Sequence, residues 1–142
     1  MIYTNMTKKA LKICFNAHKE QVDKTGIPYV FHPFHLAEQM ENEDAVCVAL
    51  LHDTVEDTDI TFDDLIKEGF NENVINALKL LTHNDDTPYL EYVLKIKENP
   101  LARIVKLADL YHNSDLTRLD LSVDKIPPKY HIYKEAIKIL EG

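Results

Sequence analysis

Apolar residues recur along most of the chain at the three- and four-residue spacing of amphipathic helices. The first such segment covers residues 6–24, and Gly26 follows it as the expected stop. Alternation of apolar and polar residues, which marks strands, is almost absent, and the chain contains only three glycines. The pattern therefore predicts an all-α fold. The apolar face of the first segment consists of Ala10, Ile13, Cys14, Ala17 and Val22.

Further helices are predicted from the prolines and capping residues at their expected starts. Pro33 suits the first turn of a helix over 33–41. The next segment, 43–56, contains AVCVALL and is apolar almost all round, which is typical of the buried centre of a bundle. Together these signals predict one domain over residues 1–142, a compact bundle of about seven or eight helices. The other expected starts are a capping box of Thr61 and Asp64, the cap Asn71, the TP and NP pairs at 87–88 and 99–100, and the PP pair at 127–128.

The net charge of the chain limits the classes of ligand that it is expected to bind. The chain of 142 residues carries a formal charge of −8, which argues against a nucleic-acid polymer as partner, because such a surface needs a basic footprint. It does not exclude a small anionic ligand, since a metal ion and a few placed lysines or arginines can reverse the local sign.

The chain also reads as cytoplasmic, with no membrane partner. No apolar run approaches the roughly 20 residues of a membrane span, and the N-terminus lacks the apolar core of a signal peptide. Cys14 and Cys47 lie far apart and form no CxxC pair, so we expect two reduced core thiols. Neither length nor composition predicts an oligomeric state.

The stretch HDTVED at the end of the apolar helix has no packing explanation. It contains His52, Asp53, Glu56 and Asp57 within six positions. Residues four apart share a helix face, so His52 is expected near Glu56 and Asp53 near Asp57. Imidazole and carboxylate together suit a divalent ion such as Mn, Fe, Co or Zn, whereas the lack of a cysteine ligand speaks against a structural zinc site. Two ligands are too few, so others must come from elsewhere.

His32 and Asp109 are the best candidates for the missing ligands. His32 sits in a proline-bounded turn, and Asp109 is an acid on the apolar stripe of a late helix, where an unpaired carboxylate would be very costly. Each has a simpler alternative: His32 as a helix cap, and Asp109 as the ion-pair partner of Lys106 or Arg103. The conjunction of both with the HD pair favours the metal site.

The strings PYVFHP, ALLHDTVEDT and VKLADLYHN, in this order, resemble the hydrolase motifs of RelA/SpoT-type proteins, within the HD phosphohydrolase superfamily. The similarity runs from about Lys24 to Asn113. It implies the HD-domain bundle and an enzyme, a metal-dependent phosphohydrolase that removes the 3′-pyrophosphate of (p)ppGpp to give GDP or GTP and pyrophosphate. It also implies one divalent ion, typically Mn²⁺. The ligands would be His32, His52, Asp53 and Asp109, and the catalytic carboxylates Glu56 and Asp57.

The resemblance extends to substrate-binding residues. Lys24 matches a basic position ahead of PYxxHP, although Asp23 stands where the family commonly has a second basic residue. Asn113 is expected to hold polar groups of a small anionic nucleotide. Tyr29 either packs against the nucleoside or anchors its loop to the core. A chain of this length is expected to hydrolyse only, since it lacks room for the synthetase domain of longer relatives.

Departures from the motifs leave the substrate open. Leu110 replaces the basic residue that usually follows the ligand aspartate, Thr82 lacks the lysine that usually follows it, and two acids, Asp85 and Asp86, come soon after. An alternative is an HD phosphohydrolase for another nucleotide or small phosphate ester. A third possibility is a non-catalytic nucleotide-binding or interaction module, which would be expected to have lost a ligand or a catalytic acid.

Overall fold

The computed structural model describes residues 1–120 and 125–142. Those two ranges contain nine α-helices, one 3₁₀ helix and no strand beyond an isolated bridge between Val22 and Pro28. The predicted all-α bundle is therefore confirmed. Its helices are α1 (Asn5–His18), α2 (Phe31–Glu38), α3 (Glu43–Leu51), α4 (Thr54–Asp57), α5 (Phe62–Lys67), α6 (Glu72–Leu81), α7 (Tyr89–Lys97), α8 (Pro100–Asn113), η1 (Leu116–Arg118) and α9 (Tyr130–Glu141).

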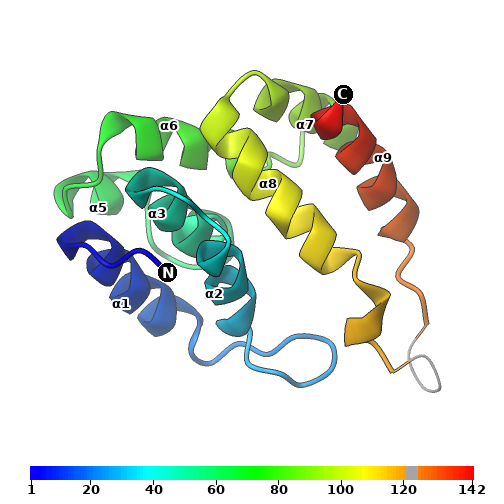
Figure 1. Cartoon of the computed structure of the whole chain (residues 1–142), viewed down its shortest axis with the longest axis horizontal. Helices are drawn as coiled ribbons and strands as arrows, with labels where there is room; N and C mark the ends of the chain where they lie inside the picture. Colours follow the sequence, from blue (N-terminus) through cyan, green and yellow to red (C-terminus); the bar gives the residue numbers. More distant parts are fainter. Residues whose placement is uncertain (121–124) are drawn as a thin grey trace.

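Helix α3 forms the centre of the bundle, as its uniform apolarity predicts. Every residue from Ala45 to Leu51 is buried, because α3 packs against α1, α2, α6 and α8. Helix α8 runs obliquely across this group, and α7 and α9 cover its other side (Figure 1). Since α3 and α8 touch directly, side chains at the end of α3 can meet side chains from the middle of α8.

The predicted helix over 43–56 is wrong in one respect, because it breaks at the HD pair. His52 is the C-cap of α3, and Asp53, with φ −105° and ψ 1°, leaves the helical region before α4 begins. The His52 side chain supplies a physical reason, since its Nδ1 lies 2.7 Å from the carbonyl oxygen of Ala49 and competes with helix continuation. Glu56 consequently does not lie one turn beyond His52 on a continuous helix.

Gly26 ends a turn rather than a helix, so the predicted first helix is too long. Helix α1 stops at His18, and the chain folds back between Val22 and Pro28. Asp23 Oδ1 accepts hydrogen bonds from the backbone N–H groups of Thr25 and Ile27, at 2.9 and 3.1 Å. Gly26 has φ +84°, a conformation that glycine adopts without strain. The turn folds the segment before α2 back along the end of the first helix, where the backbone N–H of Tyr29 donates a 2.9 Å hydrogen bond to the carbonyl oxygen of Gln21.

Most of the predicted helix starts are confirmed. Thr61 and Asp64 form the capping box of α5, and the side chains of Asn71 and Asn99 cap α6 and α8. Thr87 does not cap α7, whose N-cap is Pro88 and has no side-chain hydrogen bond. The last helix begins at Tyr130, two residues beyond the proline pair.

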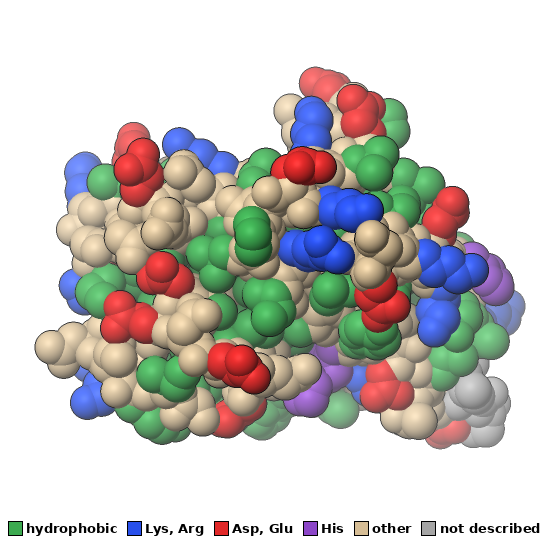
Figure 2. Space-filling model, turned by 45° about the horizontal axis from the view of Figure 1, so that its top comes forward, with side chains coloured by type: hydrophobic (Ala, Val, Ile, Leu, Met, Phe, Trp, Pro, Cys, Tyr) green, Lys and Arg blue, Asp and Glu red, His purple; other side chains and the backbone are tan. Residues whose placement is uncertain are grey.

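Two further expectations concern thiols and membranes. Cys14 and Cys47 are both free and buried, and burial raises the pKa of each to about 12. Within the described ranges, no helix combines the length and apolarity that crossing a bilayer requires. On the face drawn in Figure 2, acidic and basic side chains lie interspersed rather than gathered into one basic surface.

Candidate functional site

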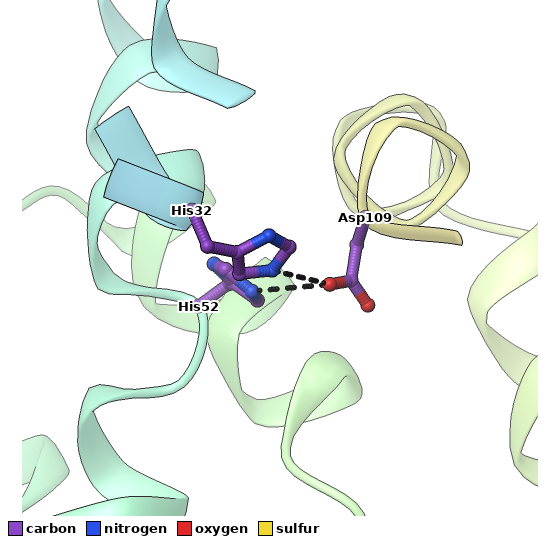
Figure 3. A group of neighbouring side chains, drawn as sticks. All are labelled: His32, His52 and Asp109. Atoms are coloured by element: carbon purple, nitrogen blue, oxygen red, sulfur yellow. Dashed lines mark hydrogen bonds and ion pairs between the residues drawn. The ribbon is translucent and has the colours of Figure 1, made fainter. Parts of the chain in front are cut away.

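Three of the predicted metal ligands converge at the centre of the bundle. His32 comes from the first turn of α2, His52 from the end of α3, and Asp109 from α8 (Figure 3). Each is only 5% exposed. Asp109 Oδ1 lies 2.8 Å from His32 Nε2 and 3.5 Å from His52 Nε2. One ligand atom from each of the three lies within 4.8 Å of the others, a spacing at which they could hold a metal ion.

The orientation of His52 suits metal binding. Its Nδ1 lies 2.7 Å from a backbone carbonyl oxygen, that of Ala49, so Nδ1 carries a proton, and Nε2 is the nitrogen whose lone pair an ion would use. Burial opposes the charged form of this histidine, but the carboxylates of Asp53 and Asp109 outweigh it and hold the pKa of His52 well above its usual value. Nε2 is buried and has no hydrogen-bond partner of suitable geometry, although Asp53 Oδ2 lies 3.1 Å away. A buried nitrogen left without a partner is costly, and a cation at this point would satisfy it.

Asp53 belongs to a second, neighbouring group. Its carboxylate lies with those of Glu56 and Asp57, and ligand oxygens of the three are within 4.8 Å of one another. The ion pair between His52 Nε2 and Asp53 Oδ2, 3.1 Å long, joins the two groups. Burial opposes the charge of Asp53, but His52 outweighs it and lowers the pKa of Asp53 to about 2. All six residues of the predicted metal and catalytic set therefore lie together.

Glu56 and Asp57 differ from Asp53 in their protonation behaviour. Burial, followed for Asp57 by the nearby charge of Asp53, raises the pKa of both carboxyls. Glu56 Oε1 also accepts a hydrogen bond of 2.6 Å from the backbone N–H of His83, which partly offsets the rise in its pKa. A carboxylate with a raised pKa is a better proton acceptor than an ordinary one.

Asp109 uses its two oxygens differently. Oδ1 faces the histidines and also accepts a 3.0 Å hydrogen bond from Asn113 Nδ2, whereas Oδ2 lies 2.9 Å from Lys106 Nζ. Although burial opposes both charges, their attraction holds the pKa of Asp109 well below and that of Lys106 well above the usual range. The alternative that Asp109 pairs with Lys106 is thus correct, and it is compatible with a metal on the other oxygen.

A hollow of about 400 Å³, the main hollow, opens beside these groups. A second hollow of about 200 Å³, the side hollow, shares three of its lining residues, namely Asn113, Lys129 and Tyr133. The main hollow is lined by His52, Asp53, Glu56, Asp57, Leu81, His83, Tyr89, Tyr92, Val105, Lys106, Asp109, Asn113, Lys129, Ile132 and Tyr133. The side hollow adds Asp23, Lys24, Thr25, Asp115, Arg118, Leu119 and Pro127.

The three predicted substrate-binding residues lie in different places. Asn113 lines both hollows and Lys24 lines the side hollow. Tyr29 lines neither. Its ring lies 4.9 Å from that of His18, and its hydroxyl donates a short hydrogen bond to Asp53 Oδ2. Burial, reinforced by Asp53, raises the pKa of Tyr29, so the hydroxyl keeps its proton. These contacts fit the anchoring alternative, and the nucleoside contact of Tyr29 stays a prediction.

Sequence reasoning missed Lys129 and Tyr133. They stand four positions apart at the start of α9, a spacing that places both on one helix face, and this spacing was the only available signal. The structure also shows where the residues that depart from the family motifs lie. Leu110 is fully buried, and the exposed Asp85 and Asp86 line neither hollow.

Comparison with known proteins gives one family and several relatives. Residues 10–109 match the family model described as the HD domain, a range that contains all four predicted metal ligands. A guanosine-3′,5′-bis(diphosphate) 3′-pyrophosphohydrolase of Aquifex aeolicus is 34% identical over 118 residues, 75% of this chain and 17% of that protein.

Shorter relatives match over more of their own length. The protein named guanosine-3′,5′-bis(diphosphate) 3′-pyrophosphohydrolase MESH1 is 37% identical in Mus musculus, covering 73% of this chain and 66% of the mouse protein. Its Xenopus tropicalis counterpart is 32% identical over 94% of this chain and 84% of that protein. A solved structure described as a metazoan ortholog of SpoT that hydrolyses ppGpp aligns with a TM-score of 0.75 and 24% identity. The alignment covers all of this chain and 89% of that one, and shows the same fold.

Proposed function

This chain belongs to the HD domain family, and from that premise we propose that it is a metal-dependent phosphohydrolase that acts on (p)ppGpp-like nucleotides. It removes the 3′-pyrophosphate and leaves GDP or GTP and pyrophosphate. The observation that carries the proposal is the buried group of His32, His52 and Asp109 beside the three carboxylates that line the main hollow. The names of the relatives in Aquifex aeolicus, Mus musculus and Xenopus tropicalis support the substrate.

The family and the donor set imply a divalent ion, for which we propose Mn²⁺. His32, His52 and Asp109 would hold it together with Asp53. Imidazole nitrogens and carboxylate oxygens suit Mn²⁺, and the unpartnered His52 Nε2 supplies a lone pair. When bound, such an ion would lower the pKa of a water molecule and stabilise charge on the attacked phosphoryl group.

Glu56 and Asp57 would perform the proton chemistry. Glu56 Oε1 is held by the backbone N–H of His83, so Oε2 is the oxygen that takes the proton of the attacking water. Its raised pKa suits this role, since the proton acceptor works best when its pKa lies close to the working pH. Asp57, beside it, would orient the same water. Tyr29 would hold Asp53 in place through its hydroxyl.

The two adjacent hollows suit a nucleotide with several phosphates. Their volumes of about 400 and 200 Å³ together fall within the range of small-molecule sites. Lys106 and Lys129 line the main hollow, and Lys24 and Arg118 line the side hollow. We assign phosphate binding to Lys24 and contacts with polar groups of the nucleotide to Asn113. The enzyme would act on the cytoplasmic pool of small nucleotides.

A second candidate substrate is another nucleotide or a small phosphate ester. The specific observation in its favour is the charge of the main hollow, where two lysines face the carboxylates of Asp53, Glu56, Asp57 and Asp109. Leu110, fully buried, contributes no cation where relatives commonly have one. A less charged substrate would fit this balance better.

Hydrolysis of ppGpp by the purified protein with Mn²⁺, its products separated by anion exchange, tests the proposal. Asp53→Ala serves as the inactive variant and Asp63→Ala, an exposed acid on α5, as its matched control. We expect GDP and pyrophosphate from the wild type and from Asp63→Ala only. Turnover of another nucleotide but not ppGpp would favour the second candidate. Metal binding without turnover of any nucleotide would favour the non-catalytic module.

A further inference from the structure

His112 makes a direct contact with a proposed metal ligand although it lines no part of the main hollow. Its Nδ1 lies 2.6 Å from Nδ1 of His32, which stands 80 positions earlier in the chain. His32 turns its other nitrogen, Nε2, towards Asp109. The two ring nitrogens of His32 thus face different partners, one at the proposed metal site and one behind it.

The two rings lie edge to edge in one plane. Their planes differ by only 7°, and their centroids are 4.9 Å apart. The two Nδ1 atoms are only 2.6 Å apart. The centroid separation exceeds this nitrogen separation by about two ring radii, as expected when the two rings lie in one plane and meet at their edges. A stacked pair would instead keep its nitrogens about as far apart as its centroids. The contact is therefore an in-plane N–H···N hydrogen bond, the geometry in which such a bond is strongest.

A metal ion bound to His32 would determine which ring nitrogens of His32 and His112 carry protons. The ion requires the lone pair of Nε2, so the proton of a neutral His32 must be on Nδ1. His32 Nδ1–H then donates to His112 Nδ1, which must carry a lone pair, and His112 keeps its own proton on Nε2. With His32 Nε2 instead donating to Asp109, His112 can reverse the bond by donating from Nδ1. Position 112 therefore needs a side chain that can accept a hydrogen bond from His32 when the ion is bound and donate one when it is not.

Other residues fix the position of His112. The ring of His35 lies 4.3 Å from it, and the backbone carbonyl of His112 accepts a 2.7 Å hydrogen bond from Arg118 Nη1. The neighbouring Asn113 donates to Asp109 Oδ1. Two successive residues at the end of α8 therefore hold two different ligands of the same proposed centre.

We propose that His112 is a positioning residue for the metal centre, which sets the tautomer and ring orientation of His32 through the Nδ1–Nδ1 hydrogen bond. This inference rests on the proposed metal site. Hydrogen-bond partners of this kind typically change metal affinity by about 10- to 100-fold when they are removed. The loss should appear in the binding of the metal itself, before any substrate is present.

The test is calorimetric titration of the metal-free protein with Mn²⁺. His112→Leu removes the hydrogen bond, whereas His112→Asn keeps a polar atom near the place of Nδ1 that can accept or donate. His131→Leu, at an exposed histidine of α9, is the matched control. We expect Mn²⁺ affinity to fall by about 10- to 100-fold in His112→Leu and by less than about tenfold in His112→Asn. His131→Leu should bind as the wild type does. Circular dichroism melts report whether each variant folds.

Equal affinity of His112→Leu and the wild type would overturn the inference, and so would equal losses in the leucine and asparagine variants. A His32→Ala variant separates this failure from failure of the metal site: if it binds Mn²⁺ as the wild type does, the proposed centre falls as well. A measurement on the wild type is independent of variant folding. With Zn²⁺ bound, ¹⁵N spectra should show His32 protonated at Nδ1 and His112 at Nε2. Protonation of His112 at Nδ1 in this state would contradict the proposal.

Discussion

Replacing Lys106 with methionine tests the electrostatics at the centre of the bundle. The Lys106 side chain is 13% exposed and that of Asp109 6%, and the two are 2.9 Å apart. Methionine keeps an unbranched stem but removes the charge. Breaking a buried ion pair from one side costs about 3–5 kcal/mol, because the remaining charge is uncompensated. The histidines beside Asp109 compensate part of it, so we expect the lower end, about 3 kcal/mol.

Lys106 also lies over two aromatic rings, 5.7 Å from the centroid of Tyr89 and 5.5 Å from that of Tyr92. Losing these contacts adds about 0.5–2 kcal/mol. For a chain of this size, the combined loss of about 3.5–5 kcal/mol corresponds to a fall in Tm on the order of 10–20 °C. The effect is therefore large enough to measure in a single unfolding series.

The assay is urea unfolding at pH 7 in EDTA, repeated with saturating Mn²⁺. We expect the loss to be smaller with Mn²⁺, because the ion compensates the charge of Asp109. Lys95→Met, at an exposed lysine of α7, should stay within about 0.5 kcal/mol of the wild type. A loss in EDTA below about 1 kcal/mol would refute the reasoning, as would an equal loss with and without Mn²⁺.

The pH dependence follows from the same pair. Lys106 holds the pKa of Asp109 well below its usual value. The carboxylate therefore adds stability above its unfolded pKa of about 3.9, and this stability is lost as the pH falls from there through the lower folded pKa. In EDTA, the wild type should lose more stability across this acidic window than Lys106→Met does. Parallel curves for the two proteins would assign the acid sensitivity to other groups.

Four other predictions concern the site and the core. Asp53→Ala and Glu56→Ala should both abolish hydrolysis of ppGpp, but elemental analysis should find only the first variant without metal. Metal loss in Glu56→Ala as well would contradict the separation between metal ligand and catalytic carboxylate. Lys24→Ala should raise KM more for a multiply phosphorylated substrate than for a monophosphate, and steady-state kinetics showing equal effects would remove Lys24 from phosphate binding. Leu51→Ala should lower the urea-derived free energy of unfolding by about 2–5 kcal/mol because the side chain is fully buried, and exposed Leu94→Ala is the control; equal losses would contradict this. Removing the metal with EDTA should lower Tm, and re-adding Mn²⁺ should restore it, whereas an unchanged Tm would speak against a bound ion.

The helical fold could be predicted because its signals are local. The apolar spacing of 71–81 and the caps Asn71 and Asn99 each lie within one helix, so neighbouring residues determine them. The break at His52 could not be predicted in this way. It depends on a side chain that turns back to the carbonyl of Ala49, and the apolar pattern of 43–56 continues through it unchanged.

The site could be predicted only where its residues form a motif. His52, Asp53, Glu56 and Asp57 are neighbours in the sequence, whereas the contact between His32 and His112 joins residues 80 positions apart. No local pattern indicates which nitrogen of a histidine meets which partner. Lys129 and Tyr133 were missed for a related reason, since an amphipathic helix looks the same whether its polar residues face solvent or a hollow.

The contact between His52 and Ala49 has a consequence for transferring this site to another protein. The carbonyl of Ala49 is among the last four of α3, which have no partner within the helix, and the His52 ring occupies it. In the middle of a helix that carbonyl would already be bonded, so the same ring would lack its anchor. A designer who grafts the HD pair into a new bundle must therefore graft the helix terminus with it.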